Sequence, residues 1–516
     1  MGDTSANNKG MNHARLYQLI LFPFNNGATN VYYVLTMSFI AYYANGVLSL
    51  SLMFATTMVT VMRVFDAVTD PILGALIDKT NGRFGKFRPF MVIGNLIMIV
   101  SSLLLYFGLR LTTHGALRYV FFVLFYMLYV IGYTFQTACT RSGQTCLTND
   151  PKQRPLFTIF NTVASMAGMG IIQLLAPMIA SRYPEGYNSA RFFNQLIPLC
   201  IIVSALLTVL AVIGIWEKDN ASYFGVAGNT KQKIKVRDYI EILKSNGELR
   251  RLIIAGAGSK LAFAIATNMT VLCMLYGCMM KNYNGLYLPM MILGYVFSAP
   301  FFLLTVKVSQ KYGQKYSLML FTFVALVMYV GVLILLLLWK QNVPSLSLNL
   351  SHLNLYTFFF ILFFCTGYGA YYATADMSIP MVADCSDYET FRSGKYVPGI
   401  MGTLFSLVDK LVSSLGSTIV GLSILSIGIK TLPDGNTPYA SGMKTIVIIL
   451  FCIVPMVAWI IALVSMKGYR LNAEKMREIQ MINYVRKFYM TKGCSLEEVM
   501  VKYSKIEDVP PEFVQQ

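Results

Sequence analysis

The sequence predicts an all-α membrane protein with twelve transmembrane helices arranged as two six-helix bundles. Of its 516 residues, 56% are apolar and 13% are charged, and the mean hydropathy of +0.57 lies outside the range of soluble domains. Apolar runs approaching the ~20 residues that cross a bilayer recur along the whole chain. The predicted spans are 31–44, 49–62, 89–109, 117–135, 156–180, 194–216, 252–278, 285–306, 317–339, 354–375, 397–425 and 444–466.

The longest polar stretch between spans follows six of them and precedes the other six. We therefore divide the chain into an N-terminal six-helix bundle (1–216), a cytoplasmic linker (217–249), a C-terminal six-helix bundle (250–466) and a cytoplasmic tail (467–516) whose end we expect to be flexible. Short basic turns occupy matching places in the halves, GALIDKTNGRFGKFRPF at 74–90 and VKVSQKYGQKYSL at 306–318. Matching halves of this kind are typical of transporters built from repeats.

The formal net charge of +18 reflects membrane topology. Lys and Arg concentrate in the loops on the side that carries both termini, including the turns above and the linker. Cytoplasmic loops of membrane proteins carry this excess, so we expect a multi-pass protein of the cell (inner) membrane with both ends in the cytoplasm. The basic residues then contact anionic lipid headgroups, and we expect no nucleic-acid partner.

Other classes of protein find little support. Nine Cys without paired spacing and three distant His (His13, His114, His352) do not suggest a disulfide framework or a metal site. The sequence contains no GxxxxGK[ST] phosphate loop, no nucleophile elbow and no HExxH motif. We therefore expect neither an enzyme nor direct use of ATP, and no cofactor beyond a coupling ion.

Two carboxylates lie in the second span, in the stretch RVFDAVTDPILG (63–74). Asp66 and Asp70 are four residues apart and so share one face of a helix. Charge inside a membrane is costly and usually marks an ion or substrate path, and two close carboxylates repel unless a cation lies between them. The pair is a candidate Na⁺ or H⁺ site to which Thr69 adds an oxygen. In the alternative, the acids pair with Arg63 and stabilise packing; both readings can hold.

Two further charged features lie in the second half. Lys410 stands deep in the eleventh span, where a buried lysine needs an acidic partner such as Asp66 or Asp70, unless it extends to the membrane surface. The segment DCSDYETFRSGK (384–395) follows the tenth span. There we expect gating salt bridges among Asp384, Asp387, Arg392 and Lys395, or otherwise a solvated turn.

These residues carry a family resemblance. RVFDAVTDPILGALIDKTNGRFGKFRPFMVIGN (63–95) resembles the second-span signature of the glycoside–pentoside–hexuronide:cation symporters, the melibiose-permease family of the major facilitator superfamily. GYTFQTA (132–138), MVADCSDYETF (381–391), LVDKLVSSLG (407–416) and YRLNAEKMREIQ (469–480) extend the resemblance over nearly the whole chain. The resemblance implies the major facilitator fold, with two six-helix bundles that give alternating access to a central site.

The resemblance also implies roles for individual residues. Cation-site positions of the family match Asp66, Asp70, Thr69, Thr134 and Lys410. Its cytoplasmic gating loop matches the basic turn 79–88, so we assign gating roles to Arg83, Lys86 and Arg88. We expect gating roles also for Asp78, next to this turn, and for Arg63, which can pair with Asp66 in one state.

The sugar-binding positions depart from the melibiose-permease pattern. Asn30 and Thr137 replace two acids, Arg141 replaces a tryptophan and Asn161 replaces an arginine. Asn and Thr accept hydrogen bonds from sugar hydroxyls less strongly than carboxylates do. Arg141 favours an anionic group such as a uronate, provided that it faces the cavity. Aromatic rings available for stacking include Tyr33, Tyr129 and Tyr133.

We expect a Na⁺- or H⁺-coupled symporter that imports a glycoside, an oligosaccharide or a uronide and functions as a monomer. One alternative is the same fold moving a lipid-like or other non-sugar solute. A second is a non-transporting membrane sensor, which would not need the acid pair.

Overall fold

The structure, a computed structural model, describes residues 13–80, 82–111, 115–148, 153–220, 236–374, 377–394 and 398–514. Within these ranges every regular element is a helix, apart from an isolated β-bridge between Gly82 and Gly85. The chain forms two compact units: residues 1–231 with 417–438 make the first, and residues 232–416 with 439–516 make the second.

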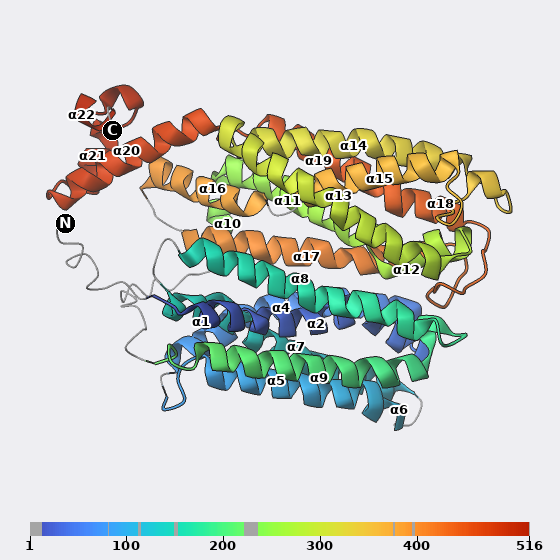
Figure 1. Cartoon of the computed structure of the whole chain (residues 1–516). Coiled ribbons are helices and arrows are strands. Elements are labelled where there is room, and N and C mark those ends of the chain that lie inside the picture. Colours follow the sequence, from blue (N-terminus) through green and yellow to red (C-terminus); the bar gives the residue numbers. More distant parts are fainter. Residues whose placement is uncertain are drawn as a thin grey trace. The chain divides into compact units, whose positions relative to one another are not determined.

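The first unit contains α4 (Leu52–Lys79), the long helix that carries the acid pair. Figure 1 shows α4, α5, α7, α8 and α9 of this unit running side by side. Its elements are α1 (Leu16–Leu21), α2 (Phe24–Val34), η2 (Leu35–Phe39), α3 (Ile40–Tyr42), η3 (Tyr43–Val47), α4 (Leu52–Lys79), α5 (Arg88–Leu103), η4 (Leu104–Gly108), α6 (Leu109–Leu111), α7 (Ala116–Leu147), α8 (Gln153–Ala180), η5 (Gly186–Asn188) and α9 (Ala190–Ile215).

The second unit holds most of the remaining helices. They are α10 (Val236–Ser245), α11 (Gly247–Ala266), α12 (Met269–Leu272), η7 (Cys273–Met279), α13 (Tyr283–Tyr312), α14 (Gln314–Leu338), η8 (Pro344–Leu346), α15 (Leu355–Tyr372), α16 (Ser378–Ser393), α17 (Pro398–Leu425), α18 (Met443–Val447), η9 (Ile448–Ile453), α19 (Val454–Lys467), α20 (Ala473–Thr491), α21 (Leu496–Lys502), η10 (Ile506–Asp508) and α22 (Pro511–Val514). The last residues of α17, from Ser417 onward, belong to the first unit.

Among the described residues, ten helices are long and apolar enough to span a membrane, or eleven if the pair Gly247–Ala266 and Met269–Met279, bent by 47°, is one span. The sequence predicted twelve. The difference lies in the first predicted span, 31–44, which is part of a continuous helical run, Phe24–Val47, that includes the π-helical turns Leu35–Phe39 and Tyr43–Val47. This run contains four asparagines, Asn25, Asn26, Asn30 and Asn45, and is less apolar than the ten spans. Such π-turns often occur at functional sites.

Helices α5 and α7 approach each other closely at two glycines. A Cβ atom added at Gly94 would collide with the backbone oxygen of Gly132, and one added at Gly132 would collide with that of Gly94. Small residues allow this contact, which is a common way for helices to pack in membranes. The contact fixes the part of α7 that carries Tyr133 and Thr134, and α7 in turn packs against α4.

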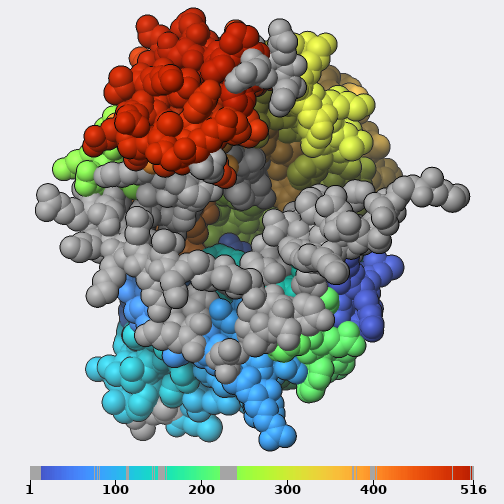
Figure 2. Space-filling model, turned by 90° about the vertical axis from the view of Figure 1, so that its left-hand side faces the viewer, coloured from blue at the N-terminus to red at the C-terminus, as the bar shows by residue number. Residues whose placement is uncertain are grey.

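The tail is folded, contrary to the expectation of a flexible end. Helix α20 packs along α16, and α21, η10 and α22 fold back onto α20. A cluster of buried apolar side chains joins them, including Ile482, Val485, Tyr503 and Phe513. Figure 2 shows the tail in red as a compact, exposed mass on the face of the second unit.

Candidate cation and substrate site

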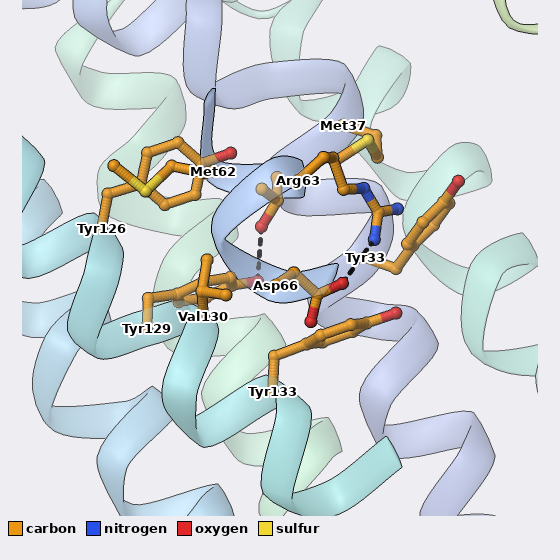
Figure 3. Close-up of a pocket in the computed structure, with 10 residues that line it drawn as sticks. Tyr33, Met37, Met62, Arg63, Asp66, Tyr126, Tyr129, Val130 and Tyr133 are labelled. Carbon is orange, nitrogen blue, oxygen red and sulfur yellow. Dashed lines mark hydrogen bonds and ion pairs between the residues drawn. The ribbon is translucent and has the colours of Figure 1, made fainter. Parts of the chain in front are cut away.

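A small pocket in the first unit surrounds Asp66. Its lining comes from α2, η2, α4 and α7, and Figure 3 shows Arg63 and Tyr133 beside the Asp66 carboxylate. The cavity measures about 20 Å³, which is room for one water molecule or a small ion and far too little for a sugar. The lining residues are Tyr33, Thr36, Met37, Met62, Arg63, Asp66, Tyr126, Tyr129, Val130 and Tyr133.

Both oxygens of the Asp66 carboxylate have partners, and its side chain is only 2% exposed. The hydroxyl of Thr134 donates a hydrogen bond of 2.8 Å to Oδ1, and the guanidinium of Arg63 lies 3.3 Å from Oδ2. Thr69 lies nearby, with its hydroxyl 3.5 Å from that of Thr134 and donating at 3.1 Å to the Asp66 carbonyl. The structure thus brings together three predicted cation-site residues from α4 and α7.

Arg63 is held on two sides. Its guanidinium pairs with Asp66 one helical turn along α4, and it stacks over the ring of Tyr33 at 4.8 Å from the centroid. A cation over an aromatic face is attracted by the negative face of the ring. Arg63 therefore pairs with Asp66, as the packing alternative predicted for one of the two acids, and Tyr33 positions it.

Asp70 lies one helical turn further along α4 and pairs across to α7. Its Oδ2 is 3.7 Å from a terminal nitrogen of Arg141, with the two side chains 25% and 61% exposed. The sequence predicted Arg141 as a substrate residue, and the structure places it against the acid pair. The chain continues through Pro71 without a break in α4.

The other predicted substrate residues form two separate arrangements. The amide nitrogen of Asn30 donates to the carbonyl and the side-chain oxygen of Asn26, at 2.8 and 2.9 Å, and Asn26 donates to the carbonyl of Asn161 at 3.3 Å. Thr137 donates to the carbonyls of Tyr133 and Thr134 in its own helix, at 3.0 and 3.1 Å. Asn26, which the sequence did not indicate, connects Asn30 to Asn161.

The basic turn between α4 and α5 is organised by Asp219, a residue that the sequence did not single out. The Asp219 carboxylate, which is fully buried, accepts hydrogen bonds of 2.8–3.1 Å from the backbone N–H groups of Lys86, Phe87 and Arg88. It also lies 3.4 Å from the Nε atom of Arg88. A carboxylate here satisfies the free N–H groups at the start of α5 and complements the positive end of the helix dipole.

Two neighbours complete this arrangement. Gly85 has a positive φ of 88°, and a Cβ atom there would collide with Asp219, so only glycine fits. The Arg88 guanidinium also stacks over Trp216 at 4.5 Å. Arg83 is exposed on the same turn, and Asp78, also predicted to gate, lies outside the described side chains.

In α16 the ion pairs differ from those that the sequence predicted. Arg392 pairs with Glu389 at 2.8 Å, one helical turn away, and not with Asp384 or Asp387, the partners that the sequence predicted. Asp387 faces the tail, where Asn483 donates to its backbone carbonyl at 2.9 Å and Gln480 donates to its carboxylate at 3.4 Å. Burial, and then the charge of Asp387, raise the pKa of Asp384 to about 6. The sequence could not show these pairings, because Glu389 takes Arg392 and the tail reaches Asp387. Lys395 lies outside the described residues.

Lys410 is half-buried on α17 and belongs to the second unit. Its placement beside the acid pair of the first unit stays a prediction. Among the described residues, no group of three or more His, Cys, Asp or Glu side chains could hold a metal ion.

A helical membrane protein with paired carboxylates in its spans is the profile of a secondary transporter. Comparison with known proteins places it in a family. The model of the family described as MFS/sugar transport protein matches residues 23–473, so the chain belongs to this family of the major facilitator superfamily and has its fold.

Curated relatives agree with this assignment. The glucuronide carrier protein homolog of Escherichia coli (strain K12) is 25% identical over 89% of this chain and 94% of its own. A lactose permease of Lactobacillus delbrueckii subsp. bulgaricus is 25% identical over 82% of this chain and 64% of its own. The crystal structure of a D-xylose–proton symporter superimposes with a TM-score of 0.58 at 15% identity, covering 86% of this chain and 97% of that one. The last likeness concerns the fold alone.

Proposed function

We propose that this chain is a secondary active transporter that imports a glycoside or uronide together with Na⁺ or H⁺ by alternating access. The observation that carries the proposal is the site on α4 and α7, where Asp66 and Asp70 meet Thr134 and Arg141. Ionisable groups inside a membrane are expensive to maintain, so they are usually functional. The printed names of the curated relatives, a glucuronide carrier homolog and a lactose permease, fit the proposed substrate class.

Charge balance explains how cation and substrate are coupled. Each carboxylate has an arginine nearby, and a bound cation shifts this balance. A carrier that holds one ligand without the other would carry an uncompensated charge through a dry site, which disfavours its reorientation. A carrier with both ligands or with neither reorients readily. Lys410, on the resemblance, takes part in the same balance.

The residues available for substrate suggest a sugar with an acidic group. The amides of Asn26, Asn30 and Asn161 offer neutral hydrogen-bonding groups of the kind that bind hydroxyls. Arg141, with 61% of its side chain exposed, offers a planar guanidinium that matches a carboxylate. We further propose that both termini lie in the cytoplasm and that the functional unit is a monomer.

Uptake of a matched pair of sugars tests the proposal. Purified protein in liposomes is given p-nitrophenyl β-D-glucuronide or p-nitrophenyl β-D-glucoside, which differ at one carboxylate, under an imposed Na⁺ or H⁺ gradient. We expect accumulation of the glucuronide under one gradient and weaker accumulation of the glucoside. Lactose and a short-chain phospholipid complete the panel. Accumulation of the lipid alone would favour the lipid-like alternative, and no accumulation of any compound would favour a sensor.

A further inference from the structure

We propose that Arg141 is an internal counter-cation: it competes with the transported cation for Asp70, and an anionic group on the substrate draws it away. The inference rests on the proposed function, and it starts from the Arg141–Asp70 contact of 3.7 Å between α7 and α4. In this mechanism the arginine makes cation binding depend on the presence of an acidic substrate.

The two ion pairs of the site differ in how firmly they are held. The Arg63–Asp66 side chains are 12% and 2% exposed, lie on one helix and have further partners in Tyr33 and Thr134. Breaking a buried pair leaves a charge without compensation and is strongly unfavourable. Arg141 and Asp70, in contrast, are 61% and 25% exposed, and exposed ion pairs contribute little. The contact between Arg141 and Asp70 is therefore the one of the two ion pairs that is more easily exchanged.

The geometry of the outer pair leaves Arg141 able to bind something better. At 3.7 Å, one terminal nitrogen approaches one oxygen of Asp70 from a distance beyond that of a strong hydrogen bond. A free carboxylate can instead take both N–H groups of a guanidinium in two parallel hydrogen bonds, which are shorter and stronger. A uronate that reaches Arg141 would thus turn the guanidinium away from Asp70 and leave that carboxylate to a cation.

Exchange of this kind makes the two ligands cooperative in both directions. If the acidic sugar raises the affinity of Asp70 for the cation, the cation must raise the affinity for the sugar by the same factor. A neutral sugar has no carboxylate to bind Arg141, so it should leave the affinity of Asp70 for the cation unchanged. Coupling would then be selective for acidic substrates through one side chain.

Cation binding to the purified full chain in detergent tests this. Binding of ²²Na⁺ is titrated without sugar, with p-nitrophenyl β-D-glucuronide and with p-nitrophenyl β-D-glucoside. Proton uptake after sugar addition, in weakly buffered solution, reads the same exchange if H⁺ is the partner. We expect the glucuronide to tighten Na⁺ binding by about tenfold, or to cause proton uptake, and the glucoside to do neither.

Three variants separate the exchange from a structural role. Arg141→Gln should bind the cation about tenfold more tightly without sugar and should lose the effect of the glucuronide. Arg141→Lys should still compete for Asp70 but should bind the glucuronide less tightly, because a lysine ammonium lacks the paired N–H groups with which a guanidinium binds a carboxylate. Asp70→Asn should bind the glucuronide at least as tightly as the unmodified protein, with no dependence on the cation. Arg182→Gln, at an exposed position after α8, is the matched control for loss of one positive charge.

The proposal is overturned if Arg141→Gln binds the cation no more tightly than the unmodified protein does, or if the glucoside changes cation binding as the glucuronide does. It is also overturned if neither Na⁺ nor H⁺ binds to the unmodified protein or to Arg141→Gln. Failure of the proposed function has a different signature. In that case no sugar accumulates in liposomes, yet cation binding to the purified protein still tightens in Arg141→Gln.

Discussion

Arg63 and Asp66 form an ion pair of 3.3 Å along α4, and both side chains are nearly inaccessible to solvent. The pair explains how an acid can remain in a membrane span, because the charge of Asp66 is compensated by the neighbouring Arg63. Asp70, one turn further, contacts the more exposed Arg141. Two carboxylates that look equivalent in sequence therefore have different surroundings.

The buried pair should behave as a unit in unfolding measurements. Asp66→Asn leaves Arg63 buried without a carboxylate and should lower the free energy of unfolding by about 3–5 kcal/mol. The double variant Arg63→Gln/Asp66→Asn should lose less than the two single losses together, because no uncompensated charge remains. Thermal and denaturant unfolding in mixed micelles measure this. Additive effects would show that the two residues do not stabilise each other.

Asp219 should be a major determinant of the turn at the start of α5. Asp219→Asn removes the charge that accepts three backbone N–H groups and faces Arg88, and should destabilise the protein by about 1.5–3 kcal/mol. Glu217→Gln is the control: its pair with Arg15 is 51% and 70% exposed, so the loss should stay below about 1 kcal/mol. Equal losses in the two variants would argue against a cap at Asp219.

Asp384 should make stability depend on pH. Burial and the neighbouring Asp387 raise its pKa to about 6, so the folded protein retains this proton at pH values where the unfolded chain has lost it. Its contribution to stability therefore falls as the pH rises from about 4 to about 6 and stays low above that range. Asp384→Asn should raise the melting temperature at pH 7.5, by a margin that vanishes near pH 4. An equal margin at both pH values would contradict the assignment.

The folded tail should depend on Arg486. This buried guanidinium donates to the carbonyl of Tyr503 at 3.0 Å and to that of Phe391 at 2.7 Å, and thereby joins the tail to α16. Arg486→Ala leaves both carbonyls without their donor and should make residues 473–514 cleavable in limited proteolysis. Lys487→Ala, at the exposed next position, should leave the tail protected. Cleavage that is equally fast in both variants would mean that the tail is held by other contacts.

The sequence predicted the local part of the site well. The spacing of Asp66 and Asp70 places them on one face of α4, and the resemblance added Thr69 and Thr134, which the structure brings to Asp66. Periodicity and motif order depend on neighbours in the chain and are visible in one sequence. The same applies to the all-helical membrane fold.

Pairings between distant segments could not be predicted in this way. The resemblance assigns Arg141 to the substrate site, and this stays a prediction; the sequence could not show its contact with Asp70, which lies on another helix. In the sequence, Asp219 is simply an acid at the start of the polar linker. The end of the tail was expected to be flexible, because the sequence does not show that α16 and other tail residues cover its apolar side chains. Each of these features depends on which surfaces meet, and a single sequence offers many equivalent choices.

Gradient-driven accumulation tests the central claim most directly. Liposomes with the unmodified protein or with Asp70→Asn receive p-nitrophenyl β-D-glucuronide under an inward Na⁺ gradient, an inward H⁺ gradient or none. The account predicts accumulation above the external concentration under one gradient, and equilibration without accumulation in Asp70→Asn. Equal accumulation by both proteins, or accumulation that ignores both gradients, would contradict cation coupling at this site.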